Sequence, residues 1–192
     1  MSDSQADTAR EEFAALRATI RERGTLRVGI FLASLAAWAI ADVATAALIT
    51  LPIASLVPLL LLAAGAEAVA SLHLGVERIG RYVQARFEST PAPNEAGPAW
   101  ERTMMAWGQR FPRTGTDPLF SVVFLLAVLL NYVPVALTAV APEMVALALP
   151  HGFAVWRILH LRAWARRQRA EDLARFQELI APAAGRPPQG ER

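Results

Sequence analysis

Apolar residues form four long runs in this chain, and most charged residues lie between the runs or after them. The runs cover residues 28–50, 53–73, 119–140 and 143–160. Each has about 18 to 23 residues, enough for an α-helix to cross a hydrocarbon core about 30 Å thick. Two short turns, Leu51-Pro52 and Ala141-Pro142, join the runs in pairs. The pattern predicts an all-α fold, a bundle of four transmembrane helices made of two helical hairpins.

Small residues form a stripe along the first apolar run. Ala33, Ala37, Ala41 and Thr45 follow one another at four-residue intervals, so they share one face of a helix. Small side chains let two helices approach closely, which is a main source of helix association in lipid. We therefore expect this stripe to pack against the second span.

Helical periodicity extends from the apolar runs into the charged regions. Phe13, Leu16 and Ile20 predict an amphipathic helix over residues 8–23 that ends at Gly24. This helix would either lie on the inner leaflet or dock on the other helices. After the second run the spacing continues to Phe87. One helix of roughly 35 residues is therefore expected there, with its last third outside the membrane.

A short amphipathic segment lies in the central loop. Trp100, Met104, Trp107 and Phe111 mark one face of a helix beside charged residues, which predicts an interfacial helix on the inner leaflet. The sequence thus divides into five parts: an N-terminal amphipathic helix (1–26), a first hairpin with a charged extension (27–89), a linker with the interfacial helix (90–117), a second hairpin with its extension (118–180) and a disordered tail (181–192).

The placement of the arginines predicts an orientation in the membrane. All 19 basic residues are arginines: five precede the first run, six lie between residues 78 and 113, and eight follow from residue 157. Cytoplasmic segments carry the excess of basic residues. We therefore expect both hairpins to run in-out-in, with the N- and C-termini and the central loop in the cytoplasm. The last group of arginines begins at the membrane surface and favours anionic lipid headgroups over nucleic acid.

Three polar residues interrupt the apolar runs at a similar depth: Asp42, Asn131 and His151. Each lies about eight or nine residues from the outer end of its span, which is about 12 Å. We expect them to form one intramembrane polar layer. Two interpretations are open. The layer could fix the register of the bundle through hydrogen bonds, or it could serve a small transporter or proton-linked component, with Asp42 and His151 titrating.

A second set of polar residues lies closer to the inner boundary. Glu67, among alanines, is expected to be a buried, protonated acid that hydrogen-bonds to a neighbouring span. Glu77 and Arg81 form an i,i+4 pair that, together with His73, is expected to hold the central loop to the bundle. His73 and His160 could also ligate a metal or bracket a haem, which is a third functional interpretation.

The composition removes several classes of function. The chain has no cysteine, which excludes disulfides, thiolate metal sites and a cysteine nucleophile. The glycine spacing of nucleotide-binding loops, a nucleophile elbow and a zincin histidine pair are also missing. We therefore predict no enzymatic activity and no bound cofactor.

The most distinctive stretches are LHLGVERIGRYVQARFE, then PAWERTMMAWG and TDPLFSVVFLLAVLLN. Together they resemble small bacterial four-span integral membrane proteins of unknown function that carry an LHxGVERIGRY-like motif. The resemblance covers residues 11–179 and implies a multi-pass protein of the bacterial inner membrane, without transferring any catalytic residue. We predict a structural or interaction subunit whose partner is a membrane protein or a second copy of the chain.

Overall fold

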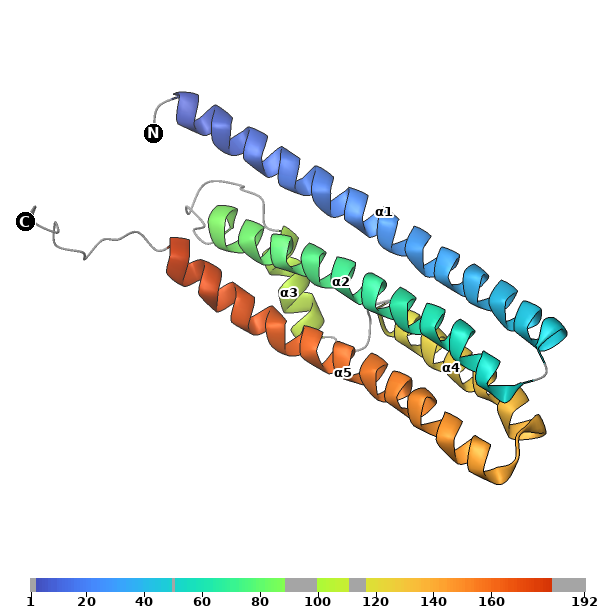
Figure 1. Ribbon diagram of the computed structural model, residues 1–192. Coiled ribbons are helices and arrows are strands. Elements are labelled where there is room, and N and C mark those ends of the chain that lie inside the picture. The colour runs from blue at the N-terminus through green and yellow to red at the C-terminus, as the bar shows by residue number, and fades with distance from the viewer. Residues whose placement is uncertain (1–2, 50, 89–99, 111–116, 181–192) are drawn as a thin grey trace, which may run out of the picture.

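The computed structural model describes residues 3–49, 51–88, 100–110 and 117–180 (Figure 1). Their regular structure is helical throughout: α1 (Asp3–Leu48), a short 3₁₀ helix η1 (Pro52–Ser55), α2 (Leu56–Phe87), α3 (Trp100–Arg110), α4 (Asp117–Thr138) and α5 (Ala141–Ile180). The helices α1, α2, α4 and α5 are long and apolar enough to cross a membrane. The predicted all-α fold with four candidate spans is therefore confirmed. The expected tail and most of the expected linker lie outside the described residues.

The long helices surround α2. Antiparallel neighbours are α1 with α2 and α4 with α5 (Figure 1). In addition, α2 packs extensively on α5 and also contacts α4, whereas α1 contacts α4 much less. As predicted, α2 continues from the apolar region through the charged sequence to Phe87. It is therefore the element against which the others are positioned.

The core lies where α2, α4 and α5 meet. Leu62 is fully buried and Phe124 is 2% exposed. The ring of Phe31 on α1 packs edge-on against Phe120 and Phe124, with centroids 4.8 and 5.4 Å apart. The other buried members of this core are Leu59, Ala66, Val69, Ala127, Val128, Ala154 and Ile158. Outward-facing residues are also apolar, which suits helices solvated by lipid.

Two sequence predictions about α1 are wrong. The helix does not end at Gly24 but runs through it, because one glycine lowers helix propensity by only about 1 kcal/mol and strong helix formers surround it. Ala33 and Ala37 do not face α2 but are exposed. The close approach occurs instead at Gly65 of α2, where an added Cβ would overlap with Ser34 Oγ.

Candidate functional site

The charged halves of the long helices pack together beyond the apolar core. The ring of Phe13 on α1 lies 5.4 Å from that of Phe87, and Phe176 on α5 lies 5.5 Å from Tyr82. Tyr82 Oη also donates to Glu12 Oε1 at 2.7 Å. The N-terminal part of α1 is thus docked on α2, one of the two arrangements predicted for it. We term this assembly the polar head: residues 3–27, 74–88, 100–110 and 161–180.

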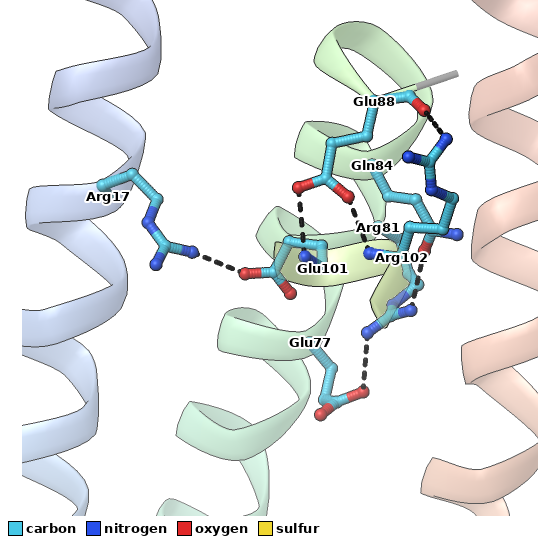
Figure 2. Close-up of polar contacts among 7 residues, drawn as sticks. All are labelled: Arg17, Glu77, Arg81, Gln84, Glu88, Glu101 and Arg102. Carbon is cyan, nitrogen blue, oxygen red and sulfur yellow. Dashed lines mark hydrogen bonds and ion pairs between the residues drawn. The ribbon is translucent and has the colours of Figure 1, made fainter. Parts of the chain in front are cut away.

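Arg81 lies inside the polar head and is only 5% exposed. Its Nη1 donates to Gln84 Oε1 at 2.8 Å, and its Nη2 lies 3.8 Å from Glu77 Oε2 (Figure 2). The same Glu77 oxygen lies 2.7 Å from Nε of Arg169 on α5. A buried charge is tolerated only when it is paired. The predicted Glu77–Arg81 pair is present and supplies a partner for this buried charge. Glu77 also contacts Arg169, so the ion pair reaches a second helix.

Glu88 connects the end of α2 to the start of α3. Its two carboxylate oxygens accept the backbone N–H groups of Glu101 at 3.0 Å and Arg102 at 2.6 Å (Figure 2). Amides in the first turn of a helix have no partner within the helix, and an anion there also complements the helix dipole. Glu88 therefore caps α3 from another element.

Sequence analysis missed this cap because capping side chains are sought next to the helix they cap. Glu88 precedes its partners by 13 and 14 residues. The only hint in the sequence is negative: Ala99, directly before α3, has no side chain that can cap a helix.

Glu101 connects α3 to α1. Its Oε1 accepts from Nη1 of Arg17 at 2.6 Å (Figure 2). Burial raises the pKa of the Glu101 carboxyl, and the guanidinium groups of Arg17 and Arg81 lower it in part. A Cβ on Gly80 would lie 2.9 Å from Glu101 Oε2, so glycine at this position leaves room for α3. The polar head is thus joined across α1, α2, α3 and α5.

Replacing Glu88 with glutamine should release α3 from α2. Glutamine keeps the shape of the side chain but loses its charge, and it places an N–H₂ group opposite one backbone donor. Loss of a helix cap costs about 0.5–2 kcal/mol. Limited trypsin digestion should then cut several-fold faster after Arg102 and Arg110, with Glu178→Gln as the matched exposed control. Equal cleavage rates in both variants would show that Glu88 does not hold α3.

A second polar site lies within the apolar bundle and centres on Asn131, which is fully buried. Its Oδ1 accepts from Trp38 Nε1 at 3.2 Å, while its Nδ2 donates to the Ser55 carbonyl at 3.0 Å and contacts His151 Nε2 at 2.9 Å. His151 Nδ1 lies 2.8 Å from the Leu147 carbonyl. The structure therefore brings Asn131 and His151 together, as expected, and adds Trp38 and Ser55, which sequence analysis missed.

This network determines the tautomer of His151. An indole N–H can only donate and a backbone carbonyl can only accept, so Trp38 and Ser55 fix which end of the Asn131 amide is the donor. His151 Nε2 must then accept, and its Nδ1–H donates to Leu147. A proton added at Nε2 would face the Asn131 amide donor.

Asp42 is not part of this network. It lies one helical turn beyond Trp38 on α1. Within the described part of the chain, the Asp42 carboxylate has no hydrogen bond or ion pair, although its carbonyl accepts from Thr45 Oγ1 at 3.0 Å. Two of the three expected members of the polar layer, Asn131 and His151, are therefore in contact, and Asp42 is not.

Glu67 differs from its predicted state. Both of its carboxylate oxygens accept N–H groups of Arg157 on α5, the Oε2 contact from Nη2 measuring 3.0 Å. Its side chain is 43% exposed, so it is not buried. The expected hydrogen bond to a neighbouring span is therefore present, but the prediction that Glu67 is buried is wrong. Sequence analysis did not identify Arg157 because the pairing depends on the relative rotation of two helices.

His73 and His160 have different partners. Arg27 Nη1 donates to His73 Nδ1 at 2.7 Å, since arginine has no acceptor. His160 is exposed, and its ring stacks on Trp156 with centroids 5.2 Å apart. Across residues 3–49, 51–88, 100–110 and 117–180, no group of three or more His, Cys, Asp or Glu side chains is arranged to hold a metal ion.

The chain matches no protein-family model, no curated protein and no solved structure. Its resemblance to small bacterial four-span proteins stays a prediction. What can be proposed about its role rests on the polar head, the buried network and the surface of the spans.

Proposed function

We propose that this chain is a multi-pass protein of the bacterial inner membrane that acts as a structural or interaction subunit, with the polar head as its contact surface. In this proposal both hairpins run in-out-in and the polar head lies in the cytoplasm. The arginine distribution supports this orientation, because the arginine-rich parts of α1, α2 and α5 gather at one end of the bundle (Figure 1).

The observation that carries the proposal is the packing of the polar head into one unit. Ion pairs join α2 to α5 through Arg78 and Asp172, which are 3.2 Å apart, and α1 to α3 through Arg17 and Glu101. A surface that is already ordered loses less conformational entropy when a partner binds. The four spans alone are enough to hold the chain in lipid. An ordered head outside them therefore supports a second role, that of a contact surface.

The exposed surface of the head has the chemistry of a contact surface. On α3, Trp100, Met104 and Trp107 are 59%, 41% and 50% exposed. On α5, Arg166 and Arg167 are exposed. Aromatic residues, methionine and arginine are enriched in protein interfaces, and tryptophan and arginine also suit the membrane–water boundary. A partner that is itself a membrane protein, or a second copy of the chain, would meet both conditions.

The buried network favours this structural role over a proton-linked one. Asn131 and His151 use their hydrogen-bonding groups on each other and on neighbouring helices, and Asp42 lies outside the network. A proton path needs a group that is free to accept and release a proton, whereas both ring nitrogens of His151 already have hydrogen-bond partners.

Photo-crosslinking in native membranes tests the proposed function. A photoreactive amino acid at Arg166 should give one protein adduct of defined mass, and the same probe at Val43, which is 69% exposed on α1, should give lipid adducts only. Replacing Arg167 with glutamine should reduce the Arg166 adduct several-fold. Lipid adducts alone at both positions would contradict an interaction subunit.

A further inference from the structure

A half-exposed ion pair lies inside the apolar part of the bundle. Glu67 on α2 is six residues from the inner end of its apolar run, about 9 Å at 1.5 Å per residue. Its partner Arg157 lies on α5, three residues before the end of the fourth run. The side chains of Arg157 and Glu67 are 38% and 43% exposed. Charged groups within a span normally face the protein interior, so this pair calls for a further surface that covers it.

The ion pair keeps hydrogen-bonding capacity that the described residues do not use. Arg157 donates to Glu67 through Nε and Nη2, and its Nη1 makes no hydrogen bond with a described residue. A carboxylate can accept about four hydrogen bonds, and Glu67 accepts two among the described residues. The pair can therefore both donate to and accept from a second pair of the same kind.

An apolar cavity of about 320 Å³ adjoins the ion pair between α2 and α5. All of its lining residues except Leu161 belong to the second and fourth apolar runs, so the cavity lies within the hydrocarbon region. Two large side chains of the lining, Leu60 and Phe153, are 70% and 62% exposed, whereas Ala63 and Ala66 are small. Large exposed residues beside small ones provide the close packing that associates helices in lipid.

The direction of α2 and α5 decides how two copies of the cavity can meet. The two helices are neighbours and both run toward the polar head (Figure 1). A twofold axis along the membrane normal would place α5 of a second copy opposite α2, and α2 of that copy opposite α5, at unchanged depth. Each Arg157 would then face Glu67 of the other copy, and each Phe153 would face the other cavity.

We propose that the chain forms a parallel twofold dimer through α2 and α5, with Arg157 Nη1 of each copy donating to Glu67 of the other. Phe153 of each copy packs in the cavity of the other. The charges are complementary, because each arginine meets a carboxylate, and the dimer removes both ion pairs from lipid. This inference goes beyond the proposed function and does not rest on the polar head, because the contact lies within the membrane and forms in either orientation.

Photo-crosslinking of the full chain in native membranes tests the contact. A photoreactive amino acid at Leu60 should give an adduct of twice the mass of the chain. The matched control is Val43 on α1, which is 69% exposed and, like Leu60, lies seven residues from the outer end of its run. It should give lipid adducts only. Lipid adducts alone at Leu60, an adduct there with a different protein, or equal dimer adducts at both positions would overturn the proposal.

Energy transfer between copies labelled through Glu178→Cys, in liposomes of varied protein density, measures the dissociation constant. Ala63→Trp fills the cavity without changing the ion pair and should abolish the dimer, whereas Ala64→Trp, outside the lining, should retain it. Glu67→Gln should raise the dissociation constant about tenfold, the effect of one lost charge-assisted hydrogen bond. Equal dimerisation of the two tryptophan variants would overturn the proposal. If Ala63→Trp does not fold, Ala63→Leu replaces it, and an unchanged dissociation constant in Glu67→Gln would by itself exclude the crossed contacts.

Discussion

Replacing Asn131 with leucine should destabilise the bundle by about 2 kcal/mol. The change removes an acceptor for Trp38 and donors for Ser55 and His151, three contacts between helices worth roughly 0.6 kcal/mol each within a membrane. Leucine has the same branching and the same number of side-chain heavy atoms, so it leaves no cavity and the loss reports mainly on hydrogen bonding. Reversible unfolding in mixed detergent micelles, followed by tryptophan fluorescence, measures it.

The control for Asn131→Leu is the neighbouring residue. Tyr132→Phe removes one hydrogen bond, from Tyr132 Oη to the Met144 carbonyl at 2.8 Å, and keeps the ring that contacts His151. It should cost about a third as much as Asn131→Leu. A leucine variant no less stable than the phenylalanine variant would show that Asn131 does not fix the helices, and the proton-linked interpretation would regain support.

Replacing Gly65 with valine should loosen α1 from α2. A Cβ at Gly65 would overlap with Ser34 Oγ, and Ser34 is held by a hydrogen bond of 2.7 Å to the Ile30 carbonyl. Overpacking of this kind costs about 1–3 kcal/mol, more than the few tenths gained in helix propensity. The same unfolding assay should show this loss.

Gly29 supplies the matched control for Gly65, because an added Cβ there would have no atom within 4 Å. Gly29→Val should change stability by less than about 0.5 kcal/mol. The exchange of Ser34→Gly together with Gly65→Ser should recover most of the lost stability, since it restores one small and one larger residue at the contact. Equal effects of valine at positions 29 and 65 would mean that the α1–α2 contact is not close.

Helix length and helical period were predictable from the sequence because each is a local property. The four candidate spans follow from apolar length, and the continuous α2 follows from spacing that persists to Phe87. The Glu77–Arg81 pair follows from i,i+4 geometry. The Asn131–His151 contact could be anticipated because residue counts place both at a similar depth.

The rotation of each helix about its axis was not predictable. Where lipid and protein interior are both apolar, hydrophobicity does not show which face is buried. For this reason the alanine stripe, Asp42 and Glu67 were assigned to the wrong surroundings. Contacts far apart in the sequence, such as Glu67 with Arg157 and Glu88 with the α3 amides, depend on that rotation and on the path of the chain.

The central claim is that the charged halves of α1, α2 and α5 form one cytoplasmic head on two in-out-in hairpins. Single cysteines test it directly, because the chain contains none. A membrane-impermeant maleimide applied to intact cells should label cysteine at Leu51 or Val140, which are 63% and 62% exposed near the turns. Cysteine at Glu178 in the polar head should be labelled only after the membrane is opened. Labelling of position 178 in intact cells, with positions 51 and 140 protected, would contradict the account.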